Sequence, residues 1–296
     1  MKKLINICLF AAATMLFASS CSAQKPDIAA IHIVYTTNLN GALRDCNCGG
    51  AVVGGMTRML TLIDSLRREH PDLLLLDSGD ALLSYPLPEA NRTMLQLLSI
   101  AKYDALNIGD QEFVESADFI FREKTSQQLD LPQISGNLDW KSGENAQLPG
   151  IVKTDVNQLK INIYGMINPA VFGFIRVPEI QVNDPAAHSA NWQLDESALQ
   201  ILLYHGSFEN AAAFVGQHPG ITAVILGHNQ TQRETIEKGT IFLETGFEGE
   251  YLGHLVISRK AGEWQFNNEF IPVLADVPPH PVAHPIVDDY FRQLLK

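Results

Sequence analysis

Short apolar runs, each followed at once by polar side chains, are the feature that most constrains how this 296-residue chain can fold. The run of leucines at 73–76 leads into Asp77-Ser78-Gly79-Asp80, and Asp80 anchors the pattern. The same arrangement recurs before Asn38-Leu39-Asn40, Asp110-Gln111, His205 and His228-Asn229-Gln230. Such runs predict buried strands, and the carboxyl ends of parallel strands meet at one edge of a sheet. We therefore expect one site there, although polar residues also end strands that have no function.

The first 20 residues have the layout of a secretory signal peptide. Two lysines precede an apolar run at 4–17 and small residues at 18–20. The small residues before Cys21 resemble a bacterial lipobox, which implies acylation of Cys21 and a tether at residues 21–28. The alternative is a plain secreted form, because Ala18 stands where a larger aliphatic residue is usual. We expect a bacterial cell-envelope protein facing the periplasm or cell surface, with the lipid anchor as its membrane contact.

Charge and cysteine content exclude two classes of protein. The net charge is −12, and removal of Lys2 and Lys3 with the signal would make it more negative, which argues against nucleic acid as a partner. Only Cys46 and Cys48 fall in the expected folded part, so a disulfide scaffold is excluded. These two thiols could form a tight bridge, stay free, bind a metal or act in redox chemistry.

The residue periodicity predicts alternating strands and helices, followed by strand hairpins. We expect strands at 31–35, 73–76, 105–108 and 159–165 and helices at 56–70, 93–101 and 117–127. Residues 240–243, 251–258 and 264–272 suggest antiparallel strands that close a second sheet. This order predicts two sheets packed face to face with helices outside, in one large domain at 29–273. A proline-rich extended linker up to Pro285 and a terminal helix at 286–296 would complete residues 274–296.

Seven sequence blocks carry a resemblance to a known family. They are residues 36–41, 54–58, 76–80, 109–113, 205–206, 227–230 and 246–252. In order and spacing they resemble the calcineurin-like metallophosphoesterases, and more narrowly the N-terminal domain of the periplasmic 5′-nucleotidase family, over residues 31–273. The resemblance implies a four-layer αββα sandwich of the metallo-dependent phosphatase type, with a two-metal centre at one edge. We expect this chain to lack the separate C-terminal nucleotide-binding domain of that family.

The resemblance also implies metal ligands. The family pattern places one metal on Asn38, Asn40, Asp80 and Gln230 and the other on Asp80, Asp110, His205 and His228. The family has Asp and His at the positions of Asn38 and Asn40, Asn-His at Asp110-Gln111, and His at Gln230. Neutral amide oxygens hold a divalent ion poorly, so we expect the first position to be empty. Two imidazoles and two carboxylates could still hold one zinc or manganese ion at the second. In a remodelled first position, Cys46 and Cys48 could supply thiolate ligands.

These departures weaken the expected chemistry. Two-metal hydrolysis needs both ions, and Gln111 cannot deliver the proton that the family histidine supplies. Asp80, Gln111 and Arg58 are the catalytic candidates, although Arg58 could be only a surface cation or the partner of a nearby carboxylate. Two functions remain open. One is hydrolysis of a phosphorylated small molecule, and the other is a non-catalytic module that binds an unknown envelope protein.

Overall fold

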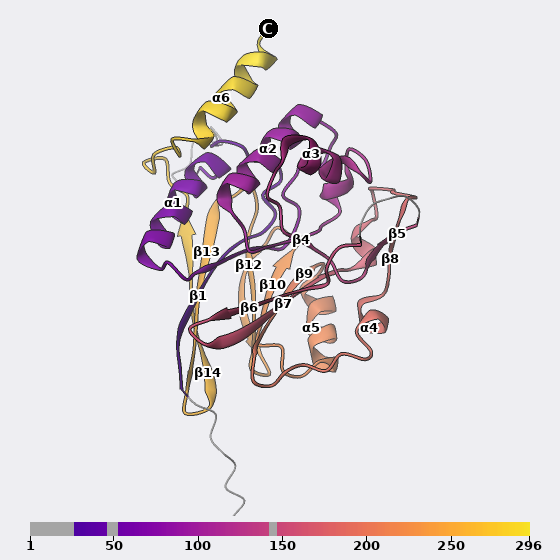
Figure 1. Cartoon of the computed structure of the whole chain (residues 1–296), viewed down its shortest axis with the longest axis vertical. Coiled ribbons are helices and arrows are strands. Elements are labelled where there is room, and N and C mark those ends of the chain that lie inside the picture. The colour runs from indigo at the N-terminus through magenta and orange to yellow at the C-terminus, as the bar shows by residue number, and fades with distance from the viewer. Residues whose placement is uncertain (1–26, 46–52, 142–146) are drawn as a thin grey trace, which may run out of the picture.

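The computed structural model describes residues 27–45, 53–141 and 147–296, which form two six-stranded sheets packed face to face (Figure 1). Four parallel strands form one side of the first sheet, and an antiparallel hairpin extends the sheet beside β1. In spatial order its strands are β14 (Glu263–Pro272), β13 (Tyr251–Lys260), β1 (Ile28–Thr36), β2 (Leu74–Asp77), β3 (Ala105–Asn107) and β4 (Gln133–Ile134).

The second sheet has four parallel strands with one antiparallel strand at each edge. In spatial order they are β11 (Gln232–Glu237), β12 (Thr240–Thr245), β10 (Ala223–Gly227), β9 (Leu199–His205), β7 (Leu159–Ile167) and β6 (Ile151–Val156). A separate two-stranded ribbon pairs β5 (Leu138–Trp140) with β8 (Ile180–Val182). The carboxyl ends of the parallel strands in the two sheets supply the loops described below.

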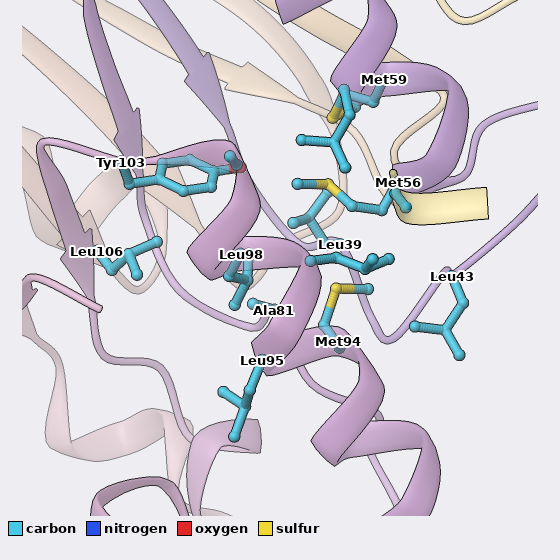
Figure 2. Packing of buried hydrophobic residues seen from close by; sticks show 14 of the residues in the cluster. Leu39, Leu43, Met56, Met59, Ala81, Met94, Leu95, Leu98, Tyr103 and Leu106 are labelled. Atoms are coloured by element: carbon cyan, nitrogen blue, oxygen red, sulfur yellow. The ribbon is translucent and has the colours of Figure 1, made fainter. Parts of the chain in front are cut away.

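Helices cover the outer face of each sheet (Figure 1). The first sheet is covered by α1 (Met56–Glu69), α2 (Pro88–Ala101), α3 (Phe119–Gln127) and α6 (Ala283–Leu294). On the second sheet α5 (Phe208–Gln217) packs with the short α4 (Pro185–His188) beside it, and two 3₁₀ turns, η1 (Gln111–Phe113) and η2 (Pro169–Val171), lie in loops. Figure 2 shows Leu39 between Met56 of α1 and Met94 of α2.

Strand side chains alternate between two apolar cores, which explains the uninterrupted leucine run. Leu74 and Leu76 pack between the sheets, whereas Leu75 faces the helices. In β1 the side chains of Ile33 and Tyr35 join the core between the sheets, and Val34 joins the helical side. A strand buried on both faces needs apolar residues at every position. The predicted four-layer αββα sandwich in a single domain is thus confirmed.

The positions of the late strands correct the predicted topology. Residues 240–243, 251–258 and 264–272 were expected to close the second sheet together as antiparallel strands. Only β12 lies in that sheet, and it runs parallel to β10. The hairpin of β13 and β14 pairs instead with β1 in the first sheet. The alternation of apolar and polar residues indicates which faces of a strand are buried, but it does not indicate which strand lies beside it in the sheet.

Helix boundaries differ from the predictions where proline stands in a first turn. The second helix begins at Pro88 rather than at residue 93, and the terminal helix begins at Ala283 and includes Pro285. A first-turn amide has no partner within its helix, so proline costs little there. The sequence analysis also missed α5, although the Ser207 side chain caps it by accepting from the Asn210 amide at 3.2 Å.

Two groups of predictions concern parts of the chain outside the described residues. Residues 1–26 contain the expected signal peptide and Cys21, and residues 46–52 contain Cys46 and Cys48. Within the described ranges, no helix combines the length and apolar character that crossing a membrane requires.

Candidate metal centre

Four strand ends bring together a group of residues that could hold a metal ion. Asp80 follows β2, Asp110 follows β3, His205 is the last residue of β9, and His228 follows β10. Each offers one ligand atom, and the four atoms all lie within 4.8 Å of one another. The structure therefore assembles the four residues that the resemblance implies for the second metal position.

Close contact between the loops of the two sheets depends on glycine. A Cβ atom on Gly79 would lie 2.7 Å from the backbone nitrogen of Gly109 and 2.8 Å from His205 Nδ1. One on Gly227 would lie 2.4 Å from the carbonyl oxygen of Ser78. No side chain fits at such distances, so glycine at these two positions lets the loops place His205 beside the carboxylates.

Hydrogen bonding orients the buried His205 ring. Its Nδ1 lies 2.9 Å from the carbonyl oxygen of Ser78, which can only accept, so Nδ1 carries a proton and donates it. Its Nε2 then lies 3.3 Å from Asp80 Oδ1 and 3.2 Å from Asp110 Oδ1. On the other side of Asp110, His228 Nδ1 is 3.3 Å from the same Oδ1. Ligand atoms around a tetrahedral zinc ion are separated by about 3.3 Å, so these spacings suit a metal ion.

The two carboxylates of the group favour a positive charge between them. Burial alone would lower the pKa of His205, but the carboxylates of Asp80 and Asp110 outweigh it and raise this pKa to about 10. Burial favours protonation of Asp110, yet His205 and His228 beside it hold its pKa well below the usual range. A bound cation would supply this charge in place of a proton. Moreover, His228 Nδ1 is buried, and its 3.3 Å contact with Asp110 Oδ1 lacks the geometry of a hydrogen bond, so this nitrogen is available to a metal and the donor set fits one.

At the first metal position, the side chain of Asn38 takes part in a hydrogen-bond network that suits an amide and not a cation. Asn38 Oδ1 accepts from the backbone N–H of His228 at 2.6 Å. Its Nδ2 donates to Glu244 Oε1 and to the carbonyl oxygen of Gly246, both at 2.9 Å. Both Nδ2 hydrogens and the Oδ1 are therefore occupied, which fixes the amide orientation. Burial raises the pKa of Glu244, and the hydrogen bond from Asn38 opposes that shift.

The two other residues of this position offer little to a metal. Asn40 lies beside Asp80, because its backbone N–H donates to the Asp80 carbonyl at 2.9 Å. Its Oδ1 is buried and has no hydrogen-bond partner in the described part of the chain. Gln230 is exposed. Apart from the shared Asp80 carboxylate, which already accepts from Gln111, the position offers one free neutral amide oxygen, so these residues do not fit a second metal.

Gln111 binds a ligand residue directly. Its Nε2 donates to Asp80 Oδ2 at 3.0 Å, and its backbone N–H lies 3.2 Å from Asp80 Oδ1. An amide in this place holds the Asp80 carboxylate but has no titratable proton at neutral pH.

Glu112 is a positioning residue that the sequence analysis missed. Its carboxylate accepts from the backbone N–H groups of Asp80 at 3.0 Å, Ala81 at 2.8 Å and Gly109 at 2.6 Å. It thus ties together the loops after β2 and β3 that carry Asp80 and Asp110. The available signal was its position inside the sequence block at 109–113, directly after Asp110 and Gln111.

The structure does not place Arg58 in this group. Arg58 lies on α1, donates to the carbonyl oxygen of Val277 and pairs with Asp45 at 3.5 Å. The ion pair matches the alternative interpretation of Arg58 as the partner of a nearby carboxylate, and the hydrogen bond to Val277 links α1 to the segment before α6.

Comparisons with known proteins agree with this architecture. No family model matches the chain. It is 25% identical over 267 residues to the trifunctional nucleotide phosphoesterase protein YfkN of Bacillus subtilis, which covers 71% of this chain but only 18% of that protein. The 5′-nucleotidase precursor of Thermus thermophilus superposes with a TM-score of 0.78 at 16% identity, over 90% of this chain and 59% of that one. The calcineurin-like phosphoesterase YfkN structure from Bacillus subtilis gives 0.71 at 21% identity, over 91% and 98%. The homologues and structural neighbours of this chain are therefore 5′-nucleotidases and calcineurin-like phosphoesterases, and the chain has their fold.

Proposed function

We propose that the chain binds one divalent ion, zinc or manganese, through Asp80, Asp110, His205 and His228 and hydrolyses phosphoric esters of small molecules there. The observation that carries this proposal is the convergence of two imidazoles and two carboxylates within 4.8 Å at one edge of a phosphoesterase fold. The His228 side chain is 34% exposed, so a substrate can reach the group from solvent.

The residues of the site suggest which esters would react. When bound, a divalent ion would neutralise phosphate charge and polarise a phosphoryl oxygen. Glu112 and Gln111 would hold the Asp80 carboxylate in place. Gln111 can donate a hydrogen bond to a phosphate but cannot protonate a leaving alkoxide. Esters with acidic leaving groups, such as aryl phosphates, would therefore react faster than nucleoside monophosphates.

A steady-state assay of the purified protein with zinc, manganese, cobalt or calcium tests this proposal. We expect turnover of an aryl phosphate with kcat/KM about 100-fold or more above that of nucleoside monophosphates, because a missing general acid costs roughly 10²–10⁴-fold. Asp110→Asn should abolish the activity. His284→Gln, on the exposed side of α6, is a matched control and should keep it. Equal rates on both substrates would contradict the role given to Gln111.

A second function is favoured by the network around Asn38. Two-metal hydrolysis uses a second metal ion and a proton donor. Here the Asn38–Glu244 hydrogen bond occupies the place of the second ion, and Gln111, hydrogen-bonded to Asp80, stands in place of the proton donor. The alternative is a non-catalytic module that binds a phosphorylated small molecule or an envelope protein. Absence of turnover with every ion, together with one bound metal by elemental analysis, would support this alternative over the hydrolase.

We also propose that the chain is exported and anchored to the bacterial envelope through acylated Cys21. Support comes from the residues 1–20 that resemble a signal peptide with a lipobox. Cells expressing the protein should incorporate radiolabelled palmitate into it, and Cys21→Ala should lose all of the label. Label retained in that variant would rule out the anchor.

A further inference from the structure

We propose a second metal site, formed by His32, His70 and His254, that binds a divalent ion of the zinc or copper type. It is separate from the candidate metal centre, because His32 lies in the middle of β1 whereas the residues of the centre lie at the ends of β2, β3, β9 and β10.

Three separate elements contribute the imidazoles. His32 lies on β1, His254 on the neighbouring β13, and His70 directly follows α1. His32 pairs with Val256 and His254 with Val34, so the two histidines are diagonal neighbours across the two strands. Each ring offers one nitrogen, and the three nitrogens lie within 4.8 Å of one another.

The contacts between the rings are close. His32 Nδ1 lies 3.0 Å from His254 Nε2. The His32 and His70 rings stack with centroids 3.6 Å apart and planes 13° apart, and the His70 and His254 centroids are 5.6 Å apart. All three side chains are partly exposed, so the rings have room to turn out of this stacked arrangement until three nitrogens point at one tetrahedral ion.

Negative charge lies next to the three imidazoles. Glu269 stands directly opposite His254 on β14, and Glu69 precedes His70. Negative charge of these two carboxylates beside the rings favours a cation there.

An ion can reach the cluster from solvent. A surface hollow of about 220 Å³ is lined by His32 and His70 and by the acidic Glu69 and Asp72. Three neutral imidazoles suit zinc, copper and nickel rather than magnesium or calcium. Three protein ligands leave one position for water or a carboxylate, as in open zinc sites.

Zinc binding to a variant with a disabled candidate metal centre tests the proposal. In Asp110→Asn/His228→Asn, equilibrium dialysis followed by elemental analysis should find one zinc per chain. Adding His70→Gln or His254→Gln should weaken this binding about tenfold or more, since even the loss of a group that only orients a metal ligand costs 10–100-fold. His70 is the preferred position because it is partly exposed and follows the helix end, so its replacement should not disturb folding, which circular dichroism can check.

Two further measurements complete the test. Adding His284→Gln, a histidine on α6 paired with Asp288, should leave zinc binding unchanged. With copper, the electron paramagnetic resonance spectrum of the Asp110→Asn/His228→Asn protein should show coupling to imidazole nitrogens, which His70→Gln should reduce. Either no bound zinc in that protein, or equal zinc in the His70→Gln and His254→Gln variants, would overturn the proposal.

Discussion

Replacing Asn38 with aspartate is expected to make the folded protein depend on a divalent cation. The Asn38 amide donates to Glu244 Oε1 at 2.9 Å in a buried position. An aspartate would set its carboxylate against that of Glu244 and against the Gly246 carbonyl oxygen. An unpaired buried charge costs about 3–5 kcal/mol, which corresponds to a melting temperature lower by roughly 10 °C.

The measurement is thermal unfolding in chelator and then in excess zinc or manganese. The cation should restore most of the loss in Asn38→Asp, because it would separate the two carboxylates and gain a charged ligand. Asn38→Asp/Glu244→Gln is the control, since an amide at 244 can donate to the new carboxylate and should recover stability without metal. An unchanged melting temperature of Asn38→Asp in chelator would refute this view of the first position.

Replacing Glu112 with glutamine is expected to lower both stability and metal affinity. Glu112 Oε2 accepts from the backbone N–H groups of Asp80 and Gly109, and Oε1 accepts from that of Ala81. A glutamine has one oxygen and one NH₂ group, so at least one buried N–H would face a donor. We expect a loss of about 2–4 kcal/mol in the free energy of unfolding. We also expect metal binding weaker by about 10–100-fold, because the loop carrying Asp80 loses its support.

Glu115 offers a matched control for this experiment. Its Oε1 alone accepts from the backbone N–H of Leu87 at 2.6 Å and from Asn91 Nδ2 at 2.8 Å. A glutamine can keep both hydrogen bonds through its own oxygen, so Glu115→Gln should change stability little. Urea unfolding in chelator measures both variants. If Glu112→Gln stayed within about 0.5 kcal/mol of the native chain, as ordinary surface substitutions do, the proposed positioning role would be wrong.

The strand ends could be predicted from the sequence because they are local features. The leucine run before Asp80 marks β2, and the apolar residues before Asp110 mark β3. Parallel strands of one sheet then necessarily end at one edge, which brings Asp80 and Asp110 together without knowledge of side-chain packing. His205 and His228 follow in the same way from the second sheet.

The long-range side-chain contacts that determine what each site can bind could not be predicted from the sequence. Asn38 and Glu244 are 206 positions apart, and His32 and His254 are 222 positions apart. Each pair depends on which strands become neighbours, and the pairing of β13 with β1 was itself predicted wrongly. An asparagine in the first position indicated only a weak ligand, whereas the structure shows an amide whose donors and acceptor are all occupied.

Anomalous diffraction from a crystal grown with excess zinc tests the central claim most directly. We expect a zinc peak about 2.0–2.2 Å from His205 Nε2 and the Asp110 carboxylate, with no second peak near Asn38 and Asn40. A pair of zinc peaks within roughly 4 Å of each other at that edge would contradict it, because two metal ions at that spacing form a complete two-metal centre.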